Sequence, residues 1–211
     1  RKYIGTTIEN LGQAEKEIFS LGELIEAFSL ERVQKAGAIF DTKKLDWLQG
    51  QWIRKLSAQE FLAYIRPLLE QHLPEAIADR HLGKKLSLIQ QRITFAYEAP
   101  EMLGYFYKNP TVTVDLLVNE KQGVTRENLP QLLQIAISAL QSVEPSVWTD
   151  EHLLQTFRDT AKSHSVKLGQ LLWPVRSALT GRVYSPGAVE VACVLGKEEV
   201  IRRLTNDKLY S

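Results

Sequence analysis

The apolar residues of this chain recur at helical spacing along almost its whole length, and no other feature constrains the fold as strongly. A helix that buries one face carries apolar residues at every third or fourth position. Residues 20–37 follow this pattern and stop at Gly37. The apolar residues of this stretch are Leu21, Leu24, Ile25, Phe28 and Val33. Because the same spacing returns in most later stretches, the sequence predicts an all-α fold.

Two further helices are predicted in residues 43–56 and 57–73. The first has one apolar stripe, made of Leu45, Leu48, Trp52 and Leu56. The second begins with Ser57 and Glu60 at the spacing of a capping box, in which each side chain satisfies a free backbone N–H of the other residue. Pro67 has no backbone donor and its ring crowds the preceding turn, so we expect it to kink or break this helix.

In the middle of the chain, the sequence predicts one helix followed by an irregular connector. Residues 83–100 have helical spacing and are closed by Ala99–Pro100. Residues 105–119 are rich in β-branched residues around Asn109–Pro110, which favours an irregular link between two subdomains.

Three helices are predicted after the connector, in residues 127–143, 149–165 and 185–196. Thr149 is the expected N-cap of the second of these helices. In the third, Ser185 is the expected N-cap, Pro186 suits the first helical position and Gly196 suits the stop.

Composition and charge favour a soluble globular protein with a basic C-terminal part. A chain of 211 residues that is 44% hydrophobic can bury a sizeable core. The net charge is +1, but residues 158–208 carry nine Lys or Arg against five Asp or Glu. Such a local excess fits either a solvated helical surface or a binding face for nucleic acid.

Several sequence features bear on processing and location. The chain opens with Arg1 and its only methionine is Met102, so we expect a fragment or a processed chain. It has no apolar run long enough for a membrane span and no signal-peptide pattern, so we expect a cytoplasmic protein without membrane contact. The single cysteine, Cys193, cannot form an internal disulfide, and its apolar neighbours predict a buried helix face.

The residues offer no recognisable catalytic or metal-binding motif. Neither a glycine-rich phosphate loop nor a Gly-x-Ser-x-Gly elbow occurs. Glu198 and Glu199 are adjacent, and neighbours on a helix point about 100° apart, so they cannot flank one substrate bond. Four histidines lack metal-ligand spacing, namely His72, His81, His152 and His164. We therefore expect no catalytic residue and no metal site, and the chain predicts a binding or docking module.

Two long segments resemble bacterial-type glutamyl-tRNA synthetases. Residues 28–54 resemble that family's series Phe-Ser-Leu-Glu-Arg-Val, Phe-Asp and Lys-Leu-x-Trp-Leu-x-Gly-x-x-Ile-Arg. Residues 164–204 are similar to its Val-Lys-Leu-Gly-Gln, Pro-x-Arg-x-Ala-Leu-Thr-Gly, Ser-Pro-Gly and Leu-Leu-Gly-Lys-Glu motifs. Because the two segments stand in the family's order, the resemblance extends over residues 18–205.

The resemblance implies a C-terminal region without the catalytic part. The family's catalytic half is a Rossmann-type domain with two ATP-binding motifs, and neither occurs here. Residues 1–55 would be the end of a stem-contact region, and residues 56–118 and 119–211 would be two helical-bundle subdomains that form an anticodon-binding cage. The resemblance further implies that this fragment holds no cofactor and is inactive alone. The full-length enzyme would ligate glutamate to tRNA with ATP and magnesium.

The resemblance also implies which residues touch the anticodon. Arg176, Ser185 and Pro186 fall where the family holds the first base. Ala188 and Val189 fall where it contacts the middle base. Such contacts suit single-stranded bases, which are read by hydrogen bonds from arginine and from backbone groups and by stacking. The glycine turn in this stretch would bring Arg176 and Ser185 together.

Three residues of the N-terminal half complete the predicted interface. Arg92 falls where some family members place an arginine that reads the last anticodon base, by which glutamate and glutamine tRNAs differ. The alternative for Arg92 is an exposed helical arginine without such a role. Trp47 is expected in the core, with a contact to the tRNA backbone as the alternative. Arg54 is expected to contact the tRNA backbone or to pair with an acid such as Asp46.

The resemblance implies the anticodon loop of glutamate tRNA as the partner, and we expect a monomer. From the residues alone, a helical protein-docking module remains the alternative. A docking module predicts an exposed apolar groove and binding that is insensitive to salt. Anticodon recognition predicts a basic face and a steep salt dependence.

Overall fold

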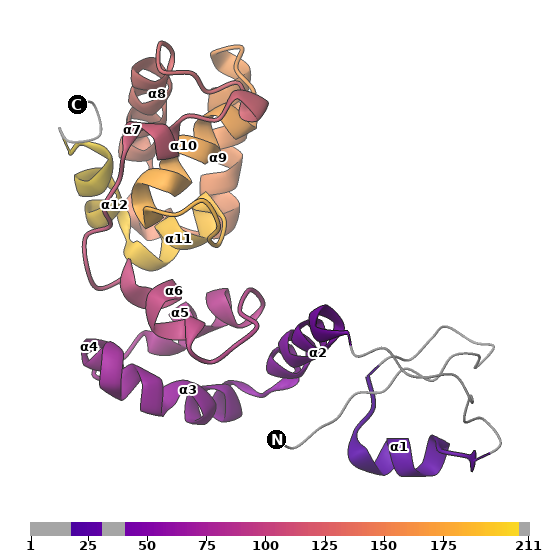
Figure 1. Cartoon of the computed structure of the whole chain (residues 1–211). Coiled ribbons are helices and arrows are strands. Elements are labelled where there is room, and N and C mark those ends of the chain that lie inside the picture. The colour runs from indigo at the N-terminus through magenta and orange to yellow at the C-terminus, as the bar shows by residue number, and fades with distance from the viewer. Residues whose placement is uncertain (1–17, 31–40, 207–211) are drawn as a thin grey trace.

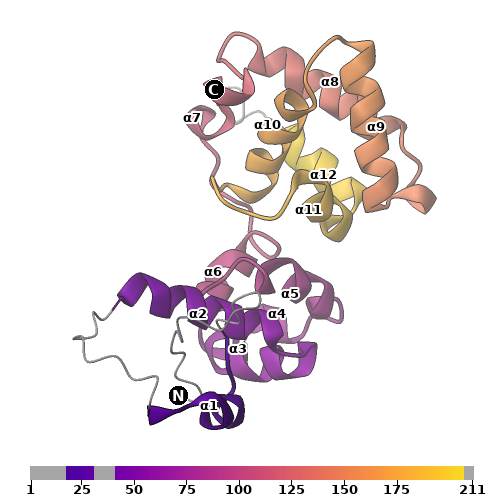
Figure 2. The same cartoon turned by 90° about the vertical axis from the view of Figure 1, so that its right-hand side faces the viewer.

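A computed structural model describes residues 18–30 and 41–206 of the chain. Within these ranges it contains twelve α-helices and no β-strand, so the predicted all-α fold is confirmed. Helices α2 to α6 form one group and α7 to α12 form a second group beside it (Figure 1, Figure 2). None of the described helices is long and apolar enough to span a membrane.

Helix α1, Leu21–Ala27, is shorter than the helix predicted over residues 20–37. Its N-terminus has a capping box between Ser20 and Glu23. The backbone becomes extended at Phe28, so the helix ends at Ala27. The predicted stop at Gly37 lies outside the described residues. No residue of α1 is buried, and the exposed apolar side chains in and just after it are Leu21, Ile25, Phe28 and Leu30.

The first group of helices is built on α3. Its members are α2 (Thr42–Lys55), α3 (Ala58–His72), α4 (Pro74–Ile77), α5 (Leu82–Gln90) and α6 (Glu98–Gly104). Helix α3 packs against α4, α5 and α6. Its predicted capping box is confirmed, because the Ser57 hydroxyl accepts from the Glu60 N–H while the Glu60 carboxylate accepts from the Ser57 N–H.

Pro67 lies inside α3 and does not break it, so of the two expectations for this residue the break is wrong. The buried face of α3 consists of Phe61, Ile65 and Leu69, all 0% exposed. Packing along this face stabilises the turns on both sides of the proline. Pro67 itself lies on the exposed side, as does residue 63, whose carbonyl loses its partner to the proline. Water can satisfy that carbonyl, so the helix continues.

Ala99–Pro100 lies in the first turn of α6 and does not close a helix, which corrects the predicted boundary. Helix α5 ends at Gln90, and turns separate it from α6. Proline suits a first turn because the backbone donors there have no intrahelical acceptor. The pair that is predicted to end one helix therefore starts the next.

The predicted apolar stripe of α2 is only partly right. The buried residues of this helix are Leu48, Gly50 and Ile53. Leu45 is 45% exposed, because α2 contacts its neighbours mainly through its C-terminal half. There the Gln90 side chain donates to the Ile53 carbonyl at 2.9 Å.

The second group surrounds α10, Leu168–Thr180. Packed against it are α7 (Val114–Leu117), α8 (Leu129–Ser142), α9 (Asp150–Ser163), α11 (Ala188–Leu195) and α12 (Lys197–Leu204). Thr149 caps α9 and Gly196 ends α11, as predicted. Cys193 of α11 is half-buried, and burial raises the pKa of its thiol, which agrees with the predicted packed helix face.

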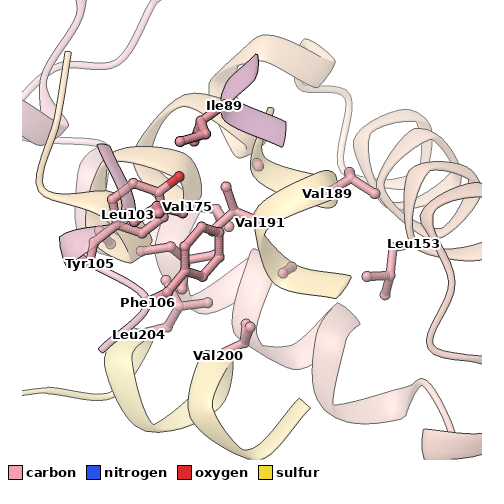
Figure 3. Close-up of a cluster of buried hydrophobic side chains, with 14 of the residues drawn as sticks. Ile89, Leu103, Tyr105, Phe106, Leu153, Val175, Val189, Val191, Val200 and Leu204 are labelled. Carbon is pink, nitrogen blue, oxygen red and sulfur yellow. The ribbon is translucent and has the colours of Figure 1, made fainter. Parts of the chain in front are cut away.

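Residues 105–113 link the two groups, and the start of this link belongs to the core. Tyr105 and Phe106 are only 4% and 8% exposed. They lie in one continuous apolar cluster with Val175 and Val191 of the second group (Figure 3). The connector predicted over residues 105–119 is therefore only partly irregular, since it also contains the packed helix α7.

Candidate nucleic-acid interface

Arg176 projects from α10 and stacks on Trp173. The guanidinium carbon lies 4.4 Å from the centroid of the indole ring. Arg176 Nη2, Trp173 Nε1 and Ser177 Oγ are all buried without a hydrogen-bond partner among the described residues. Burial also lowers the pKa of Arg176. Because residues three and four apart share one face of a helix, this turn of α10 gathers three polar groups that are buried and unpaired among the described residues.

Gly181 shapes the loop that follows α10. Its φ is +64°, a left-handed conformation that favours glycine. A Cβ at this position would lie 2.7 Å from Pro110 Cβ and 2.8 Å from the Thr111 carbonyl oxygen. The end of α10 therefore packs directly on the connector between the two groups, and a side chain at this position would separate them.

Thr180, the last residue of α10, contacts both the backbone of Arg176 and the side chain of Ser185. Its hydroxyl donates to the Arg176 carbonyl at 2.8 Å, and its oxygen lies 3.4 Å from Ser185 Oγ. The Ser185 hydroxyl is also 3.1 Å from the Pro186 carbonyl, to which it donates. These contacts bring Ser185 close to the Arg176 backbone, whereas the Arg176 guanidinium lies on Trp173, so the expected meeting of the two side chains at one base stays a prediction.

Helix α11 begins at Ala188 with Gly187 as N-cap, so the predicted start is wrong. Ser185 is not the N-cap, and Pro186 is not the first helical residue. Instead the Glu190 carboxylate accepts from the Gly187 N–H at 2.7 Å. This is the half of a capping box in which the N3 carboxylate satisfies the N–H of the N-cap residue, and no side chain in the described part of the chain accepts from the N–H groups of the first turn as the serine hydroxyl was expected to do.

Ala188 and Val189, the residues expected beside the middle base, are largely buried. Their exposed fractions are 5% and 8%, and Pro186 is buried as well. Val189 projects from α11 among the apolar side chains shown in Figure 3. These side chains serve mainly in packing, which leaves little apolar surface for a base at this turn.

Arg92 reaches across the junction between the two groups to the start of α11. Its Nη2 donates to Glu190 Oε2 at 3.0 Å, although the two residues are 98 positions apart. Its Nη1 donates to the Leu88 carbonyl at 2.7 Å. The same Glu190 oxygen accepts from the Gly187 N–H. The structure therefore places Arg92 beside the loop that carries Ser185.

A second ion pair ties the two groups together. Arg182 Nη2 lies 2.9 Å from Glu101 Oε1 and also donates to the Glu101 carbonyl at 2.9 Å. The nearby Tyr105 hydroxyl is buried and has no hydrogen-bond partner in residues 18–30 and 41–206. Burial raises the pKa of this hydroxyl, so the tyrosine stays neutral. The junction between the two helix groups is therefore held by the ion pairs Arg92–Glu190 and Arg182–Glu101, and by the packing of the buried Tyr105 ring.

Arg54 and Trp47 both lie on α2, in the first group. Arg54 Nε donates to the Gln91 carbonyl at 3.0 Å, directly before Arg92. Asp46 is two helical turns away on α2, roughly 12 Å along the axis, so the predicted pairing with Arg54 is wrong. Trp47 is 42% exposed, so its expected place in the core is wrong, while its alternative contact with the tRNA backbone stays a prediction.

Two exposed tyrosines lie in the loops that carry the predicted residues. Tyr184 is 85% exposed and directly precedes Ser185. Tyr97 is 66% exposed and stacks on Phe95, with ring centroids 5.3 Å apart and an interplanar angle of 9°. Exposed rings are surfaces on which single-stranded bases stack. Neither tyrosine is among the residues predicted from the sequence, although the run Tyr-Ser-Pro-Gly placed Tyr184 next to one of them.

The interface thus combines arginine donors with exposed aromatic rings on an all-helical scaffold. No group of three or more His, Cys, Asp or Glu side chains in the described ranges is arranged to hold a metal ion. Arginines and exposed rings on a helical scaffold are suited to binding a single-stranded nucleic acid. The family described as "Anticodon binding domain" matches residues 57–207, and the chain belongs to this family.

Known proteins similar to this chain are glutamate–tRNA ligases, so the resemblance seen in the sequence is confirmed. The enzyme of Clostridium botulinum strain Hall is 36% identical over 191 residues, which are 90% of this chain and 38% of that protein. The Clostridium tetani enzyme is 36% identical over 203 residues, 96% of this chain and 40% of that protein.

Solved structures similar to this chain are also glutamate–tRNA ligases. The crystal structure of a glutamate tRNA ligase from Elizabethkingia meningosepticum has a TM-score of 0.69 and 25% identity, over 95% of this chain and 38% of that chain. The chain therefore spans about two fifths of the length of the proteins it matches.

Proposed function

We propose that this chain recognises the anticodon loop of glutamate tRNA as the C-terminal region of a glutamate–tRNA ligase. The contact between Arg92 and Glu190 carries the proposal, because it joins residues 98 positions apart, and the same Glu190 oxygen accepts from the Gly187 N–H next to the predicted residues. Two reading elements on separate helix groups suit a short single-stranded loop whose bases are splayed apart. The names of the curated relatives support this class of substrate.

In the proposed complex, each predicted residue has a separate role. Arg176, Ser185 and Pro186 contact the first base, the turn at residues 188–189 faces the middle base, and Arg92 contacts the last base. The assignment of Arg176 is supported by a side chain that is partly exposed, rests on the Trp173 ring and keeps N–H groups without a partner among the described residues. The assignment of Arg92 is supported by its guanidinium, which is oriented by bonds to Leu88 and Glu190 while the side chain is still 35% exposed.

Catalysis would belong to the rest of a longer protein. We propose that the full-length enzyme is a cytoplasmic monomer that joins glutamate to tRNA with ATP and magnesium. The present chain would hold neither cofactor and would form no glutamyl-tRNA in a charging assay. Within it, we propose residues 1–55 as the end of a stem-contact region and residues 56–118 and 119–211 as two anticodon-binding subdomains.

The proposal is tested by titrating the 211-residue chain with an anticodon stem-loop of glutamate tRNA at two salt concentrations. A stem-loop with changed first and middle bases is the matched control. We expect tighter binding of the cognate loop, a marked loss of affinity at the higher salt because phosphate contacts release counterions, and weaker binding by Arg176→Ala. Equal affinity for both loops would contradict anticodon recognition by this chain.

A protein-docking module is the second candidate, and the exposed apolar side chains of α1 favour it. Leu21 and Ile25 are 62% and 67% exposed on a helix that buries no residue. A docking module would bind neither stem-loop specifically, and its partner would bind equally well at both salt concentrations. The same titration therefore separates the two candidates.

A further inference from the structure

Glu190 has one carboxylate oxygen occupied and one free. Its Oε2 accepts from both Arg92 Nη2, at 3.0 Å, and the Gly187 N–H, at 2.7 Å. No hydrogen bond to its Oε1 is present among the described residues, and the side chain is 40% exposed. The bond that caps α11 and the ion pair with Arg92 both use Oε2, so neither occupies Oε1. The second oxygen is therefore an acceptor available to a ligand at the junction.

The Arg92 guanidinium beside this carboxylate also keeps free donors. Of its five N–H groups, one is directed to the Leu88 carbonyl and one to Glu190. The pair therefore presents donors and an acceptor next to each other across the junction, with 35% and 40% of the two side chains exposed. The Watson–Crick edge of cytosine has the complementary arrangement, with a carbonyl and a ring nitrogen that accept and an amino group that donates.

We propose that Glu190 is a base-reading residue, whose Oε1 accepts a hydrogen bond from the amino group of the cytosine that Arg92 contacts. The inference rests on the proposed function, in which Arg92 meets the last anticodon base. An arginine that bonds only the carbonyl cannot separate cytosine from uracil, since both bases carry that carbonyl. At the position of the cytosine amino group, uracil has a carbonyl oxygen. Glu190 would repel that oxygen and so reject uracil.

The substitution Glu190→Gln tests this role. Glutamine can still accept from the Gly187 N–H through its amide oxygen, so the start of α11 keeps its cap. Its amide nitrogen would then stand where Oε1 stands, which replaces an acceptor by a donor. Stem-loops that differ only in the last anticodon base, cytosine or uracil, are titrated against the wild-type chain and this variant. We expect the wild type to prefer cytosine by at least about tenfold, and the variant to lose that preference.

Glu101→Gln is the matched control, because it removes the carboxylate of the other ion pair that crosses the junction. We expect this variant to keep the wild-type preference for cytosine, and circular dichroism melting of both variants to show that they fold. Equal weakening of both loops by Glu190→Gln would show that Glu190 only positions Arg92, and would overturn the inference. Failure of the wild type to prefer the cognate loop over one with changed first and middle bases would instead overturn the proposed function.

Discussion

The two arginines proposed to read the anticodon are held in opposite ways. Arg92, in the first helix group, is tied to the Leu88 carbonyl and the Glu190 carboxylate before any ligand arrives. Arg176, in the second group, has a buried nitrogen without a partner. A tied side chain loses little entropy on binding, whereas an unpaired buried donor gains a hydrogen bond that the free protein lacks. We infer that the first region contributes mainly specificity and the second mainly affinity.

The largest change to this comparison should come from Gly181→Ala, which damages the place where the second helix group packs on the connector. The new Cβ would press on Pro110 and Thr111 in a backbone conformation that alanine rarely adopts. We expect a loss of about 3 kcal/mol in the free energy of unfolding, from strain and overpacking together. Urea denaturation measures this loss. Gly83→Ala in α5 is the control, since nothing lies within 4 Å of its Cβ, and a similar loss there would contradict the explanation.

Arg176→Met should separate affinity from stability. We expect stem-loop affinity to fall about thirtyfold, close to 2 kcal/mol, because a hydrogen bond to a charged donor is lost. The free energy of unfolding should stay constant or rise by up to about 1 kcal/mol, since a desolvated charge is removed. Fluorescence titration and urea denaturation measure the two quantities. Arg92→Met is the comparison, and we expect it to change selectivity at the last base more than affinity.

Asp79→Asn should lower the free energy of unfolding by an amount that depends on pH, through the loss of an ionised carboxylate in the first helix group. Burial alone would raise the pKa of Asp79, but hydrogen bonds from Lys85, the His81 N–H and Tyr107 lower it to about 2. This carboxylate stabilises the fold above its unfolded pKa near 4, and the stabilisation disappears as the pH falls towards 2. We expect the variant to be about 2 kcal/mol less stable at pH 7.

Melting of wild type and Asp79→Asn between pH 7 and pH 2 measures this dependence. The difference between the two should shrink as the solution becomes acidic. A difference that stays constant over this range would show that packing, and not ionisation, explains the effect.

The smallest effect should come from the exposed tyrosines, one in each region. Tyr184→Ala should weaken stem-loop binding by about 1 kcal/mol, roughly fivefold, if a base stacks on the ring. Because the side chain is 85% exposed, we expect no change in the melting temperature. Tyr97→Ala tests the first region in the same assay. Unchanged affinity in both variants would exclude base stacking at these rings.

Helical spacing and capping residues predicted most of the fold, because these signals are local. Thr149, the Ser57–Glu60 box and Gly196 act within one helical turn and were correctly assigned. The errors at Pro67 and Trp47 have a different origin, since the packing of neighbouring helices decides which face is buried. No local pattern shows that face.

Only part of the candidate site could be predicted from the sequence, because contacts between distant helices leave no local pattern. Resemblance to a family indicated Arg176, Ser185 and Arg92 as neighbours of one ligand. Glu190 was missed because its partner Arg92 is 98 residues away, and no spacing within α11 signals that contact. The N-cap expected at Ser185 is wrong because α11 begins two residues later, where the Glu190 carboxylate accepts from the N–H of Gly187, the actual N-cap.

The shared apolar cluster at the junction has a consequence for dissecting the molecule. Tyr105 and Phe106, at the end of the first group, are covered by side chains such as Val175 and Val191 from the second (Figure 3). A chain cut at residue 113 would leave both fragments with an uncovered apolar surface, while the pairs Arg92–Glu190 and Arg182–Glu101 would set their register. When the two fragments are expressed separately and mixed, they should associate by complementation into a noncovalent complex.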